Sequence, residues 1–233
     1  MKGTLWLPVS ILVFSAAAAR CAELRLNPTR DARLFGHADE SKMNGGQCTR
    51  LRTRGLSTNK PEISLMDFDR KAILSFITKN RGKAITARLV LTVREVGQAD
   101  KVKVELAAFK ASVDWKEGTK NQAAAERGEC TYVEAQAGTA PWADLQGKKK
   151  ANFKDLLLGG PATAVINSTS LEVKPAMSDT KVTLTLDGNV LGTLVGVQGC
   201  RGLALFNRAG NSFADFYSRE QHQHKPELVL TAP

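Results

Sequence analysis

Hydrophobic and polar residues alternate along much of the chain, which is the period of a half-buried β-strand. In residues 85–94 every second side chain is apolar, and Thr or Arg fills all but one of the positions between. Residues 101–108 and 181–186 repeat the alternation with Lys, Glu or Thr on the polar face. We predict a strand for each segment. The turn-like sequence Gly-Gln-Ala-Asp between the first two predicts an antiparallel hairpin.

Short apolar runs near both ends of the chain predict further strands and bring the expected number to about eight to ten. This all-β pattern is typical of a sandwich or barrel. These runs are residues 32–35, 49–54, 63–68, 202–207, 213–218 and 227–232. Residues 117–160 are instead polar and rich in Gly and Ala. We predict that they leave the sheets, with a turn of helix at 153–158. No linker divides the chain into two domains.

The first 22 residues have one Lys near the start, an apolar stretch and then small residues, which is typical of a secretory signal peptide. Cleavage after Ala19 satisfies the small-residue rule better than cleavage after Ala22. Arg20 fits badly with lipidation of Cys21. The apolar stretch is short for a membrane span. We predict a signal peptide at 1–22, one domain at 23–233, no transmembrane segment, and an extracellular or periplasmic location.

The predicted mature chain is basic. Removal of Lys2 and Arg20 leaves 31 of the 33 basic residues against 23 acidic ones, a net charge of about +8. A secreted protein rarely meets nucleic acid, so we expect no nucleic-acid partner. The charge indicates an anionic glycan or an anionic surface, or serves solubility alone.

Cys48, Cys130 and Cys200 remain in the mature chain, together with Cys21 if cleavage is early. Export favours disulfide formation. No two cysteines have the CxxC spacing of zinc or redox motifs. We expect a disulfide, and the pairing stays open.

The candidate ligand-binding residues are Arg50, Arg52 and Arg54. On a strand their side chains line one face at intervals of roughly 6–7 Å. Guanidinium groups form two-point hydrogen bonds with carboxylates and sulfates, so such a row suits a repeating anion. The alternative is a solvated outer face. Residues 147–154 form a second basic cluster, which we interpret as a charged loop.

His222 and His224 would point to the same side of an extended segment and could share a metal ion. His37 is the only other His, and we interpret the pair as part of an exposed loop. Neighbours on a strand face opposite ways, so Arg219 and Glu220 do not form a catalytic pair, and Glu220 reads as a structural carboxylate.

Trp115 and Trp142 are the only Trp residues of the mature chain. An exposed Trp covers the apolar face of a sugar ring, whereas a buried one closes a core. Both interpretations stay open.

A series of short motifs runs in order from Asp31 to Thr231. Along the chain these are RDARLFGHADESKMNGG, ISLMDFDRKAILSFI, GKAITARLVLTV, WKEG, PWADLQG, RGLALFN, FADFYSRE and KPELVL. In this order the chain resembles a DNRLRE domain, a family related to carbohydrate-binding module family 96.

The resemblance implies a jelly-roll-like antiparallel β-sandwich that accompanies secreted, polysaccharide-handling bacterial proteins. Ligands suggested for relatives include alginate, a polyuronate. Our hypothesis is a secreted, non-catalytic carbohydrate-binding module for an acidic polysaccharide, with Arg50, Arg52 and Arg54 as first contacts. We expect no cofactor, although a structural calcium ion is compatible with a jelly roll.

Two alternatives remain. A structural or adhesion domain of the cell surface would show a large apolar patch and no basic groove. A polysaccharide lyase would place a His or Tyr base beside an Arg in a deep cleft.

Overall fold

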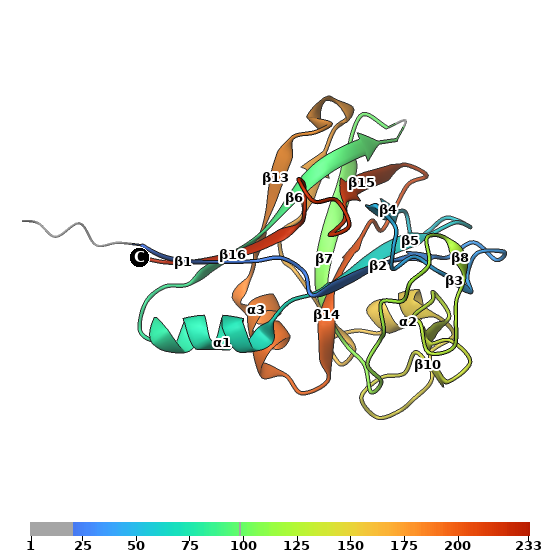
Figure 1. Ribbon diagram of the computed structural model, residues 1–233, viewed down its shortest axis with the longest axis horizontal. Helices are drawn as coiled ribbons and strands as arrows, with labels where there is room; N and C mark the ends of the chain where they lie inside the picture. Colours follow the sequence, from blue (N-terminus) through green and yellow to red (C-terminus); the bar gives the residue numbers. More distant parts are fainter. Residues whose placement is uncertain (1–20, 98) are drawn as a thin grey trace, which may run out of the picture.

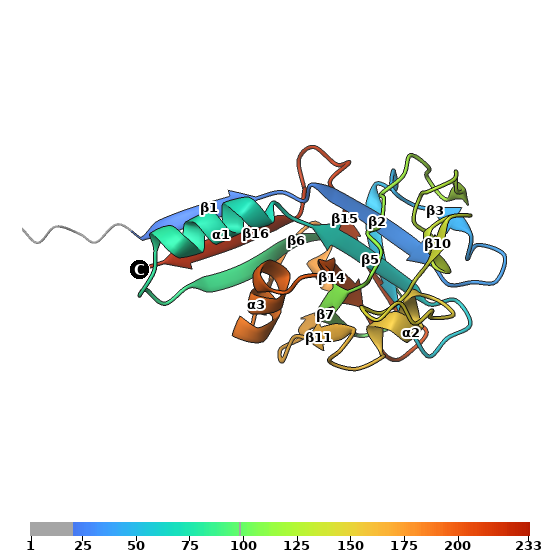
Figure 2. The same ribbon diagram turned by 90° about the horizontal axis from the view of Figure 1, so that it is seen from below.

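The structure, a computed structural model, describes residues 21–97 and 99–233. All of the predicted signal peptide except Cys21 and Ala22 lies outside the described residues. One antiparallel sheet of twelve strands forms the frame and curls round on itself (Figures 1 and 2). The predicted all-β, antiparallel sandwich class is confirmed.

The strands lie side by side in an order unlike their order in the chain. The main path runs through β1 (Ala22–Leu26), β16 (Glu227–Ala232), β6 (Thr86–Val96), β15 (Phe213–Tyr217), β4 (Arg50–Arg54), β5 (Glu62–Asp67), β14 (Cys200–Phe206), β7 (Val102–Lys110) and β11 (Ala164–Ile166). Branching from it, β2 (Arg30–Phe35) pairs with β5, β12 (Leu171–Val173) with β7, and β13 (Lys181–Leu186) with β6. Every segment predicted as a strand is a strand.

The predicted hairpin of residues 85–108 is wrong. β6 pairs with β13, β15 and β16, whereas β7 pairs with β14, β11 and β12. Alternation reveals which face of a strand is buried, but its partners depend on long-range packing. The short turn therefore joins two strands that diverge into different parts of the sheet.

The concave side of the curled sheet holds the larger hydrophobic core. Ala87, Leu89, Leu91 and Val93 of β6 are each at most 1% exposed there. Two helices that we did not predict close this core, α1 (Arg70–Lys79) and α3 (Gly188–Gly196), and both lie at one end of the sheet (Figure 1).

Asp side chains cap both of these helices. Asp69 accepts hydrogen bonds from the N–H groups of Lys71 and Ala72, and Asp187 accepts one from Val190. Such caps satisfy N–H groups that have no partner within a helix. The 3₁₀ turn η1 (Pro175–Met177) precedes β13.

A second core lies on the other face of β2, β5, β14 and β7, under residues 112–163 (Figure 2). This excursion was predicted, and α2 (Phe153–Leu157) confirms its turn of helix. Trp115 and Trp142 are 1% and 0% exposed. Their indole N–H groups donate to the carbonyls of Arg201 and Thr131. Both Trp residues therefore belong to a core, and their rings are not accessible to a sugar.

Two small sheets complete the excursion. They pair β3 (Met43–Asn44) with β8 (Ala123–Ala124) and β9 (Glu134–Gln136) with β10 (Ala140–Pro141). In the part of the chain that the structure describes, no helix has the length and apolar character needed to cross a membrane.

The expected disulfide is not formed. Cys21, Cys48, Cys130 and Cys200 are all free thiols. The last three are buried, and burial raises the pKa of each thiol. They behave as small core residues rather than as reactive groups.

Candidate functional site

The three predicted arginines lie on β4 and share one face, as expected. Register places Arg50 opposite Tyr217, Arg52 opposite Asp215, and Arg54 opposite Phe213 on β15. Directly opposite side chains on one face of an antiparallel pair are close neighbours. The sequence alone did not bring Asp215 to this row, although it occupies a polar position within an otherwise apolar strand.

Asp215 is completely buried and forms a two-point ion pair with Arg52. Its carboxylate oxygens lie 2.5 Å from Nε and 2.6 Å from an Nη atom of that residue. Burial lowers the pKa of Arg52, but the hydrogen bond and charge of Asp215 outweigh it and raise the pKa overall. The ring of Phe213 lies 3.8 Å from the guanidinium carbon and covers the pair. Arg52 is therefore a structural residue, which corrects the expectation of an open row.

The ends of the row are freer. Arg50 lies 3.6 Å from Asp215 and Arg54 lies 3.4 Å from Glu62, so both pairs are looser than that of Arg52. Their side chains are 32% and 23% exposed. Glu62 is held mainly by buried Arg33, whose Nε lies 2.5 Å from a carboxylate oxygen. Two buried carboxylates thus neutralise much of the row.

Residues of three separate motifs meet just beyond the Arg50 end of the row, where the N–H of Ser218 donates to the carbonyl of Thr49. Arg219 places its guanidinium on Glu117, with nitrogen–oxygen distances of 2.8 and 2.7 Å. Its backbone N–H donates to Asp31 at 2.8 Å, and the N–H of Asp31 donates to Glu117 at 2.8 Å. Glu220 lies 3.4 Å from the same guanidinium, which supports its interpretation as a structural carboxylate.

Burial dominates the titration of this cluster. Asp31 is 1% exposed, and burial raises its pKa to about 8, assisted by the charges of Glu117 and Glu220 and opposed by the N–H and charge of Arg219. Burial likewise raises the pKa of Glu117. Because these groups bond one another and the backbone, the arrangement ties distant segments together.

His222 and His224 lie in the turn between β15 and β16, not in an extended segment. The ring of His224 stacks on Tyr217 at 4.7 Å, and the hydroxyl of Tyr217 donates to Asp179 at 2.8 Å. Among the described residues no group of three or more His, Cys, Asp or Glu side chains is placed to hold a metal ion. A structural calcium ion stays a prediction without assigned ligands.

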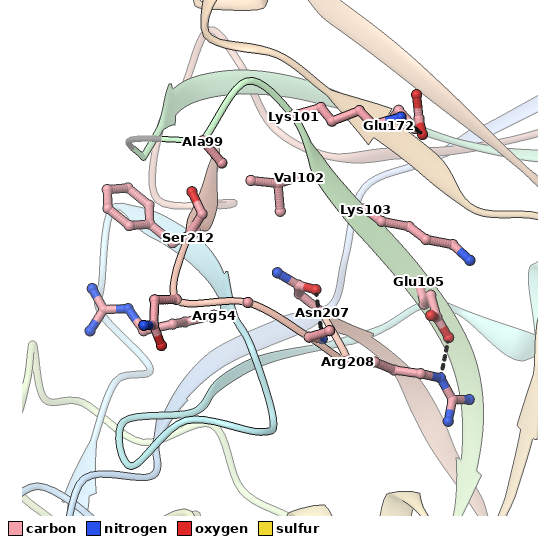
Figure 3. Close-up of a pocket in the computed structure, with 14 residues that line it drawn as sticks. Arg54, Ala99, Lys101, Val102, Lys103, Glu105, Glu172, Asn207, Arg208 and Ser212 are labelled. Atoms are coloured by element: carbon pink, nitrogen blue, oxygen red, sulfur yellow. Dashed lines mark hydrogen bonds and ion pairs between the residues drawn. The ribbon is translucent and has the colours of Figure 1, made fainter.

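A groove of about 950 Å³ among the described residues is within the usual size range of ligand sites. One wall is the turn at residues 99–101 together with the start of β7 (Figure 3). The other wall is the loop of residues 207–212 between β14 and β15, and β12 adds Glu172. Sequence analysis missed this site because its two walls are about 100 residues apart.

Basic side chains outnumber acidic ones in this groove. Arg54, Lys101, Lys103 and Arg208 line it against Glu105 and Glu172. Lys101 lies 2.7 Å from Glu172, and Arg208 lies 2.7 Å from Glu105. Lys103 makes no ion pair with any described residue, and its ammonium points outward beside the groove (Figure 3). Arg54 contributes its stem and turns its guanidinium away from the lysines.

Close backbone packing positions the loop of residues 207–212. The carbonyl of Asn207 accepts a hydrogen bond from Leu56 at 2.8 Å, and Gly55 packs against the backbone of Ala209 and Gly210. Across the groove the N–H of Gly97 donates to Phe213 at 2.8 Å. These contacts hold the groove open before any ligand binds, which lowers the entropic cost of binding.

In the second predicted basic cluster, two of the lysines bind other groups of the protein. Lys150 pairs with Asp144 at 3.1 Å, and Lys154 donates to the carbonyl of Leu56 at 2.8 Å. Lys148 and Lys149 are exposed.

In comparisons with known proteins, no family model and no curated sequence matches this chain. The site must therefore be interpreted from its own geometry.

Proposed function

We propose that this protein is a secreted, non-catalytic carbohydrate-binding module for an acidic polysaccharide such as a polyuronate, and that the polymer lies in the groove beside β7. The groove replaces the arginine row as the main contact surface, with Arg54 belonging to both. The resemblance to DNRLRE domains and the basic mature chain support the same ligand class.

The unpaired cation of Lys103 is the observation that carries this proposal. Ion pairs with Lys101 and Arg208 already engage both carboxylates of the groove, so an excess of positive charge is left for a ligand. A polyanion would gain from this charge without breaking an existing pair. Exposed charges are screened over about 8–10 Å at ordinary ionic strength, so binding would weaken with salt.

Each alternative function has less support in this groove. Its described lining contains neither His nor Tyr, so a lyase would need a base from another surface. Among the residues that the structure describes, the large exposed hydrophobic ones are Leu74, Leu145, Leu158 and Val197, which come from separate parts of the chain. An adhesion domain would be favoured by one continuous apolar patch.

The test is binding of the mature protein to a polyuronate and to a neutral glucan by isothermal titration calorimetry, at low and high salt. We expect binding to the polyuronate alone, weakening with salt. Lys103→Gln should weaken it, whereas Lys148→Gln, which removes the same charge from an exposed loop, should not. Absence of binding to any glycan by folded protein would refute the proposal. Shortening of the polymer during the experiment would indicate an enzyme.

A further inference from the structure

Two polar groups of the groove loop have no hydrogen-bond partner among the described residues. Asn207 is 5% exposed, and its Oδ1 accepts a hydrogen bond from the N–H of Ala209 at 3.1 Å. The hydrogen bonds of the described residues leave its Nδ2 without an acceptor, and Figure 3 shows the amide directed into the groove. Nδ2 is therefore a free donor that a ligand in the groove can reach.

Ser212 presents the second such group. The residue lines the same groove, and its Oγ is buried just behind the surface without a hydrogen-bond partner among the described residues. In Figure 3 its side chain lies near Ala99, and Val102 lies between the serine and the side chains of Lys101 and Lys103. Both unsatisfied groups therefore belong to one short loop whose position is set by backbone contacts.

The groove offers free donors, whereas its carboxylates and the amide oxygen of Asn207 already accept hydrogen bonds from the protein. Glu105 accepts from Arg208, Glu172 accepts from Lys101, and Oδ1 of Asn207 accepts from Ala209. A sugar hydroxyl both donates and accepts, whereas an ionised carboxylate only accepts and can take up two neighbouring donors at once. The surplus of donors thus fits a carboxylate better than the hydroxyl groups of a neutral sugar.

We propose that the loop of residues 207–212 forms a seat for the carboxylate of one uronate residue, with Nδ2 of Asn207 as the donor that faces the groove and Oγ of Ser212 as a second donor after its side chain turns out of its buried position. The buried methyl groups of Val102 border the sugar ring, and Lys103 supplies the longer-range attraction. This proposal rests on the acidic-polysaccharide function and adds to it: the selectivity for carboxylate comes from neutral groups in the loop, not from the arginine row.

Asn207→Asp is the decisive variant. It preserves the size of the side chain and the acceptor for Ala209, but replaces the donor with a negative charge. We expect affinity for a uronate hexamer to fall at least tenfold, which corresponds to about 1.4 kcal/mol. Ser212→Ala removes an unsatisfied hydroxyl, so it should weaken binding without lowering the melting temperature. Circular dichroism and the melting temperature would confirm that both variants fold.

Three further measurements distinguish this proposal from the proposed function. In the wild-type protein, the side-chain amide signal of Asn207 in ¹H–¹⁵N spectra should shift on addition of the hexamer. The hexamer with its carboxyl groups reduced to alcohols should bind weakly and equally to wild type and Asn207→Asp. A sulfated glucan should bind less tightly than the uronate hexamer at equal salt.

Failure of the wild type to bind any uronate would refute the function itself. Salt-sensitive uronate binding that survives in both Asn207→Asp and Ser212→Ala would leave the function standing and overturn the seat. Tighter binding of the sulfated glucan would also overturn it, because the groove would then select charge alone.

Discussion

Arg219 and Glu117 are 102 residues apart in the chain and form a two-point ion pair, with Nε 2.8 Å from Oε1 and Nη2 2.7 Å from Oε2. The same arginine donates to the carbonyl of Thr29 at 2.9 Å. One side chain therefore joins the turn before β16, the segment before β2 and the start of the excursion. Its planar fork, which a lysine lacks, makes this possible.

We predict that Arg219→Lys destabilises the protein because an ammonium cannot span both oxygens of Glu117 and reach Thr29. A hydrogen bond to a charged group contributes about 1.5–3 kcal/mol, so a loss of that order is expected in urea unfolding. Arg25→Lys is the matched control, since Arg25 forms exposed pairs with Glu23 and Glu227 and should unfold like the wild type. Equal stability of the two variants would contradict the structural role of Arg219.

The carboxyl group of Asp31 should make stability depend on pH. Its pKa is about 8 in the folded protein, against about 3.9 in an unfolded chain. Between these values the folded protein holds a proton that the unfolded chain releases. The free energy of unfolding therefore decreases as pH rises from about 4 to about 8, and levels off above.

Asp31→Asn tests this dependence, because the amide oxygen can still accept from the N–H of Arg219 but does not titrate. Melting temperatures between pH 5 and pH 8 should fall less steeply in the variant than in the wild type. A residual slope is expected from Glu117, whose pKa is also raised by burial. Identical slopes in the two proteins would show that Asp31 is ionised throughout.

Variants of the Arg52–Asp215 pair can distinguish a structural role of Arg52 from a role in ligand binding. Arg52→Met leaves a fully buried carboxylate with only Arg50 nearby, and breaking such a pair costs about 3–5 kcal/mol. Replacing both residues, as Arg52→Met with Asp215→Leu, should restore most of this loss. The double variant should also bind a polyuronate like the wild type. A folded double variant that no longer binds would make Arg52 a ligand contact after all.

Gly55 controls the position of the groove loop. A methyl group there would collide with the carbonyl oxygen of Gly210 and lie 3.0 Å from the carbonyl carbon of Ala209. We expect Gly55→Ala to cost about 1–3 kcal/mol and to weaken polyuronate binding by displacing the loop. Gly192→Ala, on α3 with open space around it, should be neutral or stabilising because Ala favours helix. Unchanged polyuronate binding in Gly55→Ala would show that the position of the loop does not affect binding.

Thiol counting tests the state of the cysteines. With Cys21→Ser, three thiols remain, and all three are buried with raised pKa values. A thiol reagent should react slowly with the native protein and should find three thiols per chain after denaturation without reductant. A count of one free thiol per chain would reveal a disulfide, as expected for an exported protein.

The sequence reveals strands through the alternation of apolar and polar residues, because a strand that is buried on one face has an apolar side chain at every second position. The apolar positions of β6 at Ala87, Leu89, Leu91 and Val93 are all buried, as the pattern requires. The same pattern misses α1, whose short apolar set of Ile73 and Phe76 follows directly after β5. Nor does it identify the partners of β6, since neighbours in a sheet are chosen by packing over the whole chain.

The sequence by itself determined the all-β class, the excursion of residues 117–160, the basic balance of charge, and the common face of Arg50, Arg52 and Arg54. Each follows from composition or from local periodicity. Only the tertiary structure decided which charges are available to a ligand. It placed Asp215 beneath Arg52 and left Lys103 unpaired. It also brought Asn207 and Ser212 to one wall of a groove. Charge neutralisation and groove shape arise from strands far apart in the chain, and local spacing carries no information about them.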